Sequence, residues 1–458
     1  MARYYVSSPG GGVVTGASRE KWNSKTGFVL AAVGSAVGLG NMWRFSYLAA
    51  EHGGAAFVVL YLGFTAIIGL PILLAEFALG RGSGLSPVRA LEHFGGRAWR
   101  PLGWLFVGSG FLILAYYGVI AGWTVRYALQ GLVGFVEDSG TYFEAVATGG
   151  GAIAWHFIFL AVTVLVVMRG VKGGIERIST ALMPALFVLL VVLAAYALTL
   201  EAGREGYTHY LKPDFSQIFD REVMAQAAGQ AFFSLSLGMG AMLTFASYLG
   251  DDHDLPTESL IVGLSDFGVA FVAGLVVFPV LFAFGLQSQV SGSTVGALFI
   301  TLPRAFAEMG SAGTVVGTLF FTGLVVGALT SAVSLLEVVV ATAMDSLGWS
   351  RRRAAVTLGA LIAVLGVPAA LDLDVLGLMD QVAGNVFLVM GGLALSILVG
   401  WVLPDPAAQV SPGAGSVSVP WLGFWRGLLR WVVPPVLLFV LFASLESTWN
   451  LIQGWGSG

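Results

Sequence analysis

The sequence predicts an all-α integral membrane protein whose chain crosses the bilayer eleven times. Hydrophobic residues make up 57% of its 458 residues and charged residues only 10%, whereas a soluble domain carries about 25% charged residues. Apolar runs of roughly 20 residues, the length that spans a bilayer as a helix, recur from one end of the chain to the other. The strands of a membrane β-barrel would instead alternate over about 10 residues.

Eleven apolar segments are long enough to be transmembrane helices. We place them at 27–50, 56–80, 102–130, 152–170, 175–200, 223–250, 258–286, 313–346, 353–371, 376–403 and 428–447. No soluble domain is predicted between them, but the stretches 201–222 and 287–312 contain short apolar pieces that we expect to be partial helices over an outer vestibule. Residues 404–427 are rich in Pro, Gly and Ser and are predicted to be a cytoplasmic linker.

The distribution of Lys and Arg predicts the orientation of the chain. Alternate connections are basic, and they carry Arg19, Lys21, Lys25, Arg81, Arg89, Arg97, Arg100, Arg169, Lys172, Arg177, Arg351, Arg352, Arg353, Arg426 and Arg430. The connection between the third and fourth segments, on the other side, is acidic and has neither Lys nor Arg. By the positive-inside rule the N-terminus is cytoplasmic, and eleven crossings place the C-terminus, in 428–458, outside the cell.

Composition also excludes several classes of function. A net charge of −4 indicates no nucleic-acid partner. The absence of cysteine excludes a disulfide framework, thiol chemistry and a cysteine-based metal site. The first 25 residues are polar and glycine-rich, so we expect no cleaved signal peptide. Five scattered histidines give no cluster for an enzyme, and the lipid bilayer is the expected surrounding.

Two of the predicted helices are interrupted by small residues. The first contains SAVGLGN at 35–41 and the sixth contains SLSLGMG at 234–240. Within lipid, irregular backbone survives only where it lines a protein cavity, and matched interruptions in two halves of a chain indicate a transporter site near the bilayer midplane. Glycines that only allow close helix packing are the alternative for either segment alone. The matched pair, which carries Asn41, Ser234 and Ser236, favours a site.

Such a site suits a carboxylate beside a cation. An unwound segment frees carbonyl oxygens for a hard cation such as sodium, and the N-termini of half-helices offer N–H groups to an anion.

Six motifs resemble those of the neurotransmitter:sodium symporters, in the bacterial amino-acid branch of that family. From Arg19 almost to the end of the chain they are REKW…GFVLAAVGSAVGLGNMWRF, EHGGAAF, GLPILLAEFALGR, KGGIER, GQAFFSLSLGMGA and LTSAVSLLE. The resemblance implies a leucine-transporter-like fold of two inverted five-helix repeats, 27–200 and 223–403, with unwound first and sixth helices. It also implies a cytoplasmic segment at 1–26, an extracellular loop at 201–222 and a place in the bacterial inner membrane.

The resemblance implies two sodium sites made of oxygen ligands. The first would use the substrate carboxylate with Ala36, Asn41, Ser234 and Asp266. The second would use carbonyls and hydroxyls of Gly34, Val37, Gly327, Thr330 and Ser331. For the last two residues the alternative is that mid-helix hydroxyls bond back to carbonyls of their own helix.

The substrate pocket implied by the resemblance is mostly apolar. It would be lined by Ser35, Ala36, Leu39, Gly40, Ile113, Tyr117, Phe233, Ser234, Ser236, Met239, Ser331 and Leu335. Tyr117 would donate to the substrate carboxylate, and Phe233 would close over the ligand. Because methionine adapts to varied shapes, Met239 suggests that leucine, isoleucine, valine, methionine, phenylalanine, tyrosine and tryptophan all fit.

Charged residues within or beside spans are costly and usually functional. In the family, the residues that match Arg44 and Asp380 form an outer gate. Arg19 and Asp345 match the inner gate, around which Trp22, Ser247 and Tyr248 would pack. For Arg19 and Asp345 the alternative is a solvated role at the membrane surface.

Three further positions refine the expectation. Asp266 stands where animal relatives have Asn and bind chloride, so we expect chloride-independent transport; a proton on Asp266 during the return step is a hypothesis. Gly38 stands where monoamine relatives have Asp, which favours an amino acid. Glu76 is expected to support the unwound part of the first helix.

These observations predict a sodium-coupled symporter of hydrophobic L-amino acids that works by alternating access, and not an enzyme. The alternatives are a sodium-dependent transporter of another small amino acid or amine, and an amino-acid sensor with the same fold.

Overall fold

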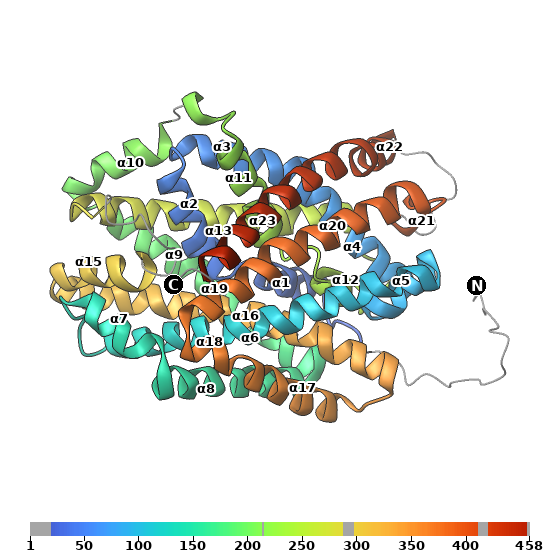
Figure 1. Ribbon diagram of the computed structural model, residues 1–458, viewed down its shortest axis with the longest axis horizontal. Coiled ribbons are helices and arrows are strands. Elements are labelled where there is room, and N and C mark those ends of the chain that lie inside the picture. The colour runs from blue at the N-terminus through green and yellow to red at the C-terminus, as the bar shows by residue number, and fades with distance from the viewer. Residues whose placement is uncertain (1–19, 213–214, 287–296, 411–419, 456–458) are drawn as a thin grey trace.

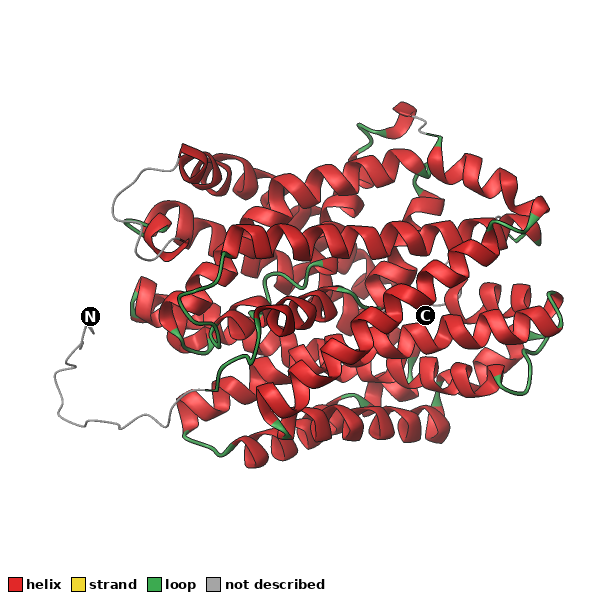
Figure 2. Ribbon diagram, turned by 180° about the vertical axis from the view of Figure 1, so that it is seen from behind, coloured by secondary structure: helices red, strands yellow, loops and turns green. Residues whose placement is uncertain are grey.

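The computed structural model describes residues 20–212, 215–286, 297–410 and 420–455, and their regular structure is entirely helical (Figures 1 and 2). The predicted all-α class is therefore confirmed. Arg19, predicted for the inner gate, lies outside the described residues.

Each predicted span corresponds to one long helix or to consecutive shorter ones. In chain order they are α1 (Lys25–Ala36), η1 (Gly40–Arg44) and α2 (Phe45–Glu51); α3 (Ala55–Phe64), η2 (Thr65–Gly69) and α4 (Leu70–Ser83); α6 (Arg100–Gly131); α8 (Gly149–Met168); η4 (Val171–Glu176) and α9 (Arg177–Ala197); α11 (Arg221–Ser234) and α12 (Ala241–Ala246); α13 (Leu255–Ala283); α16 (Ser311–Leu347); α17 (Arg351–Leu365) and α18 (Val367–Leu371); α19 (Leu373–Asp380), η9 (Gln381–Phe387), α20 (Leu388–Ile397) and η10 (Leu398–Val402); and α22 (Pro420–Gly427), η11 (Leu428–Val432) and α23 (Val433–Trp455).

Nine helical segments of the described chain are long and apolar enough to cross a membrane, and the bent pair Lys25–Ala36 and Gly40–Glu51 makes a tenth. The sixth predicted span is divided between α11 and α12, each short by itself. The last span runs over Trp421–Gln453. The boundary predicted at 428 is therefore too late, because part of the expected linker is already helical as α22.

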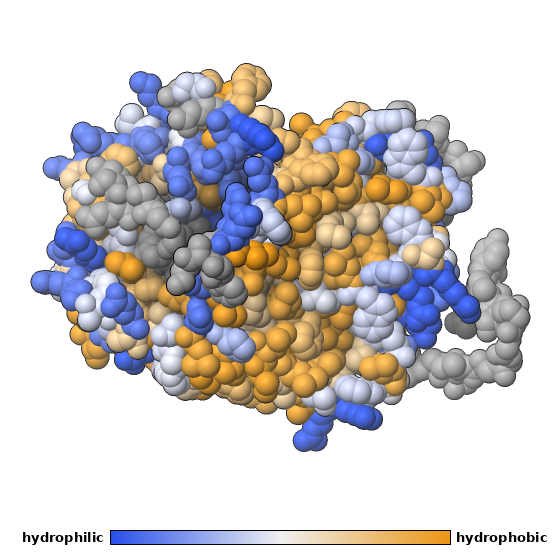
Figure 3. Space-filling model, in the orientation of Figure 1, coloured by the Kyte–Doolittle hydropathy of each residue, from blue (hydrophilic) through white to orange (hydrophobic). Residues whose placement is uncertain are grey.

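Short helices lie at the two ends of the bundle. In Figure 1, α7 (Ser139–Ala147), α10 (Arg204–Leu211) and α15 (Leu302–Glu308) gather at one end. At the other end lie α5 (Pro87–Gly95), α21 (Ala407–Val410) and α22. Figure 3 shows an apolar surface across the middle of the molecule, with hydrophilic residues concentrated toward both ends. This belt is the surface expected for a protein that faces lipid.

The centre of the bundle is formed by α6 and α16, which pack along one another. Small residues allow this approach: a Cβ placed on Gly110 of α6 would lie 3.6 Å from the backbone oxygen of Leu335 in α16. The predicted breaks lie against this pair, since α1 packs on α16. The two halves of the first broken helix are bent by 59°.

The break between α11 and α12 needs residues that tolerate left-handed backbone. Ser236, Gly238 and Gly240 all have positive φ values, of 54°, 76° and 72°. At Gly238 a Cβ would lie 2.1 Å from the backbone oxygen of Leu388, so that position has no room for any side chain. The glycines seen in the sequence thus permit both the turn and its close packing.

Candidate substrate and ion site

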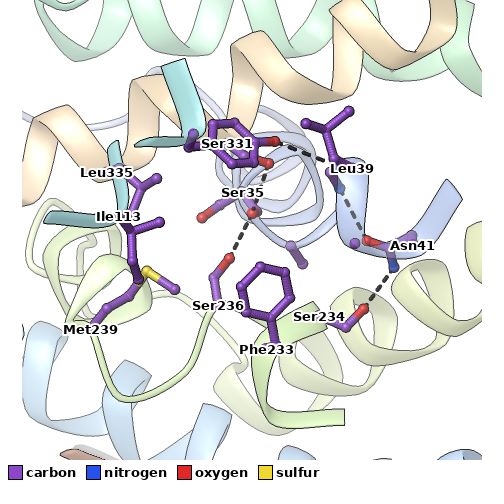
Figure 4. Close-up of a pocket in the computed structure, with 14 residues that line it drawn as sticks. Ser35, Leu39, Asn41, Ile113, Phe233, Ser234, Ser236, Met239, Ser331 and Leu335 are labelled. Atoms are coloured by element: carbon purple, nitrogen blue, oxygen red, sulfur yellow. Dashed lines mark hydrogen bonds between the residues drawn. The ribbon is translucent and has the colours of Figure 1, made fainter. Parts of the chain in front are cut away.

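The two helix breaks meet at a central cavity of about 30 Å³ (Figure 4). Its lining is formed by Ser35, Ala36, Gly38, Leu39, Gly40, Asn41, Ile113, Tyr117, Phe233, Ser234, Ser236, Met239, Ser331 and Leu335. The structure therefore brings together every residue that the sequence predicted for the pocket, and adds Gly38 and Asn41. A cavity of this size holds about one water molecule, so an amino acid would enter only as the surrounding side chains move apart.

Serine side chains connect the two breaks and α16. Ser236 donates its hydroxyl to the backbone oxygen of Ser35 at 2.8 Å, and Ser35 donates to the hydroxyl of Ser334 at 2.8 Å. Figure 4 shows the first of these bonds beside the ring of Phe233. The breaks are thus held by polar contacts that a bound polar group can replace.

Gly38 lies close to two hydroxyl groups, those of Ser331 and Tyr117. A Cβ at this position would lie 2.7 Å from Ser331 Oγ and 3.2 Å from Tyr117 Oη. The Tyr117 hydroxyl also lies 3.5 Å from the backbone nitrogen of Leu39. A side chain on residue 38 would crowd both hydroxyls, whereas glycine lets them lie against the backbone of the first break.

A fully buried polar cluster lies next to the cavity. Asp266 accepts hydrogen bonds from Asn41 Nδ2 at 2.6 Å, from the Tyr61 hydroxyl at 2.9 Å and from the Ser234 hydroxyl at 2.9 Å. Asn41 Oδ1 accepts from the backbone N–H of Gly38 at 3.0 Å, so the amide nitrogen, not its oxygen, faces Asp266. These neutral donors satisfy the carboxylate but bring no positive charge, and an uncompensated buried carboxylate is costly.

The residues predicted for a second cation site also lie together. Ser331 donates toward the backbone oxygens of Gly34 and Val37, each at 3.4 Å. A Cβ on Gly327 would lie 3.5 Å from the Val37 oxygen. Thr330 bonds back to its own helix, at 3.1 Å from the Gly327 oxygen, which is the alternative given by the sequence.

A vestibule of about 800 Å³ lies on one side of the central cavity, walled by α2, α11, η9 and α23. We call this the vestibule side. Arg44 and Asp380 both line it, but within the described chain they are not paired with each other. Arg44 donates to Asn385 Oδ1 at 3.1 Å and lies 4.8 Å from the centre of the Phe233 ring. Asp380 accepts from the Tyr116 hydroxyl at 2.8 Å.

Aromatic packing closes the opposite side, which we call the packed side. Trp22 donates from Nε1 to the backbone oxygen of Phe245 at 2.9 Å. Its ring lies edge-on to those of Phe245 and Tyr248, with centroids 5.4 and 6.5 Å away. Asp345 accepts from the backbone N–H of Ser86 at 2.7 Å. Trp22, Ser247 and Tyr248 are all buried, as expected for a closed path.

The sequence did not predict a role for two acidic residues of the packed side, Glu337 and Glu176. Glu337 accepts from Tyr248 at 2.5 Å and pairs with Arg351 at 2.6 Å. Arg351 in turn pairs with Glu20 at 2.9 Å. In the sequence, the basic run that includes Arg351 predicted only the orientation of the chain in the membrane. The same run follows the end of α16, the helix that carries Glu337.

Glu176 is the second such residue. It accepts from the backbone N–H of Asn23 at 2.8 Å and from the Ser24 hydroxyl at 3.0 Å. Ser24 is also the N-cap of α1, where it accepts from the backbone N–H of Gly27. The start of α1 is therefore attached to η4. In the sequence, the acidic residue Glu176 within the KGGIER motif was the feature that could have indicated this contact.

The predicted partner of Glu76, the unwound part of the first helix, is wrong. Its carboxylate accepts from the backbone N–H groups of Gly238 and Leu243 at 2.9 and 3.1 Å. It therefore supports the break of the sixth span and not that of the first. A local sequence pattern does not distinguish the two breaks, because both leave free N–H groups.

Two broken helices that meet at a buried cavity, between a vestibule and a closed opposite side, define a secondary transporter. Residues 19–137 and 143–452 match the Sodium:neurotransmitter symporter family. The chain belongs to this family, and it is a sodium-dependent transporter and not an enzyme.

Individual relatives agree with this assignment. The chain is 35% identical to YhdH, an uncharacterised sodium-dependent transporter of Bacillus subtilis, over 92% of this chain and 96% of the relative. It is 33% identical to an uncharacterised sodium-dependent transporter of Methanocaldococcus jannaschii, over 96% of this chain and 92% of the relative. The crystal structure of MhsT in complex with L-phenylalanine matches with a TM-score of 0.84 and 43% identity, over 93% of this chain and 99% of that one.

Proposed function

We propose that the protein couples sodium entry to the uptake of hydrophobic L-amino acids by alternating access. The observation that carries this proposal is the central cavity, where hydroxyl and N–H groups at one end adjoin apolar side chains at the other. An amino acid with an apolar side chain has the same division. The match to a phenylalanine-bound transporter supports the same class of ligand.

The carboxylate of the substrate would lie beside Gly38, which lines the cavity. Tyr117 offers its hydroxyl there, and Leu39 its backbone N–H. This N–H belongs to the residue that precedes the η1 half of the broken helix, where helix ends favour an anion. Because residue 38 has no acidic side chain, the substrate would supply the carboxylate that an amine lacks.

The apolar part of the substrate would lie among Ile113, Phe233, Met239 and Leu335. The cavity must widen for it, and Met239 has the flexible side chain that such adaptation needs. This lining supports leucine, isoleucine, valine, methionine, phenylalanine, tyrosine and tryptophan as substrates.

Two sodium ions would bind beside the substrate. Asp266 and Ser234, with the Ala36 carbonyl, the Asn41 amide oxygen after reorientation, and the substrate carboxylate, would form the first site. Gly34, Val37, Gly327, Thr330 and Ser331 would form the second. All are oxygen donors, which hard cations prefer. The fixed charge of Asp266 would take the place of a bound chloride, so transport would need none.

The vestibule would be the extracellular entrance, in a bacterial plasma membrane with the N-terminus inside and the C-terminus outside. Arg44 and Asp380 would close it after substrate binds, and the packed side would then open to the cytoplasm. The two repeats, 27–200 and 223–403, would move against each other, with 201–222 as an external loop.

Uptake into proteoliposomes tests this function. Labelled leucine or phenylalanine should accumulate with an inward sodium gradient and not with potassium, and replacing chloride with gluconate should leave the rate unchanged. Saturable binding without accumulation would instead indicate a sensor. A competition panel in which small amino acids or amines displace leucine best would indicate another substrate.

Gly38→Asp provides a sharper test of the carboxylate position. The added charge should repel the substrate carboxylate, so leucine affinity should fall by at least about tenfold, the factor for about 1.4 kcal/mol. Gly38→Ala, which adds bulk without charge, is the control. Equal losses in the two variants would argue against electrostatic exclusion.

A further inference from the structure

A chain of polar contacts joins Arg44 to the last helix. Arg44 donates to Asn385 Oδ1 at 3.1 Å, and Asn385 donates from Nδ2 to Gln381 Oε1 at 2.8 Å. Gln381 in turn donates to the Ser444 backbone oxygen at 3.2 Å and to the Thr448 hydroxyl at 3.3 Å, both in α23. The amide of Asn385 is thus oriented with its oxygen toward Arg44.

Asn385 and Asp380 lie on the same wall of the vestibule. Both line it, and the helix between them is η9, whose hydrogen bonds join residues five apart: the Leu388 N–H donates to the Ala383 oxygen. In such a helix, positions five apart are one turn apart on one face. Arg44 therefore faces two acceptors one turn apart, a neutral amide and a carboxylate.

Residue 384, which lies between these two acceptors in η9, is a glycine that packs closely against neighbouring side chains. A Cβ there would lie 3.1 Å from Asp380 Oδ1, 3.4 Å from Tyr116 Oη and 3.6 Å from Phe233 Cε2. The guanidinium of Arg44 already lies over the Phe233 ring, 4.8 Å from its centre. A side chain at residue 384 would crowd Asp380 and Tyr116, and glycine avoids this.

We propose that Asn385 is a positioning residue that holds Arg44 away from Asp380 while the vestibule is open. Gln381 and α23 keep the amide in the orientation that accepts from Arg44. A neutral acceptor holds the guanidinium more weakly than a carboxylate does, so Arg44 moves to Asp380 when the gate closes. The movement is one helical turn, about 5 Å, a step size known from other two-state transitions.

This inference rests on the proposed gating by Arg44 and Asp380, but its test measures exposure and not transport. The chain has no cysteine, so a single Ala225→Cys on α11, which lines the vestibule, reports how readily a thiol-reactive methanethiosulfonate enters. Modification rates are measured in potassium, in sodium, and in sodium with leucine.

Asn385→Asp and Asn385→Leu should change the rate at which the Ala225→Cys thiol is modified in opposite directions. The aspartate has the same size as asparagine and attracts Arg44 as strongly as Asp380 does, so modification in sodium with leucine should become about tenfold faster, and uptake should slow. The leucine variant loses the hydrogen bond to a charged group, so modification without leucine should become about tenfold slower.

Asn450→Asp is the matched control, because it adds a carboxylate to α23 in the same vestibule outside the chain of contacts from Arg44. It should behave like the parent. Equal effects of the two aspartates, or changes in the same direction for Asn385→Asp and Asn385→Leu, would overturn the inference. If the rates change as expected while leucine is not accumulated, the inference stands and the proposed function fails.

Discussion

The two sides of the central cavity are held by different kinds of interaction. On the vestibule side, Arg44 and Asp380 each contact a neutral partner, Asn385 and Tyr116. On the packed side, Arg351 joins two carboxylates, and the exposed fraction of the Glu337 side chain is 0%. A charged group that exchanges one neutral partner for another loses little, whereas breaking a buried ion pair is expensive. The comparison indicates that opening the packed side is the more costly step.

Arg351→Leu should have the largest effect. It leaves Glu337 buried without its cation, which costs about 3–5 kcal/mol, so the purified protein should unfold at a lower temperature and transport should be lost. Replacing both residues, Arg351→Leu with Glu337→Leu, should recover much of the melting temperature. A single variant as stable as the parent would show that the pair does not hold the packed side.

Glu176→Gln should weaken the packed side by about 1.5 kcal/mol, because α1 loses charge-assisted bonds from Asn23 and Ser24. A thiol placed by Ser247→Cys, which is nearly isosteric, should then react faster. Glu201→Gln, an exposed change in another connection, is the control. Slower modification of the Glu176 variant would contradict a clamping role.

Tyr116→Phe is the corresponding change on the vestibule side. Asp380 loses a hydrogen bond worth about 1 kcal/mol and becomes freer to pair with Arg44. Modification of the Ala225→Cys reporter should slow by about fivefold. Faster modification would mean that Tyr116 favours closure, and the proposed contrast between the sides would not hold.

Lys25→Ala should have the smallest effect. The Lys25–Asp252 pair, 3.6 Å apart, is exposed on both partners, and such pairs contribute little. A hydrogen bond from its own backbone, together with the charges of His253 and Lys25, lowers the pKa of Asp252. Because this pKa is lowered in the folded protein, the ionised carboxylate of Asp252 contributes to stability at pH values above about 3.9. That contribution is lost only as the pH falls below this value. Parent and variant should therefore melt alike from pH 6 to 8; a difference there would refute this.

Much of the site could be predicted because its signals are local. The breaks at 35–41 and 234–240 are visible as glycine and serine within apolar runs, and the family motifs contain all the predicted pocket residues except Ile113 and Tyr117. The structure places all of those pocket residues around one cavity. Partners across the bundle were harder: Glu76 was assigned to the wrong break, and the hydrogen bond from Asn41 Nδ2 to Asp266 was not predicted.

The sequence by itself determined the helical membrane fold, the two broken helices and the types of donor beside them. These depend on local properties, namely the length of apolar runs and the backbone freedom of glycine. Only the tertiary structure decided that Arg44 contacts Asn385, that Glu337 pairs with Arg351, and that Glu176 holds the start of α1. Partner choice depends on distances of a few ångströms between residues far apart in the chain, and packing alone sets those distances.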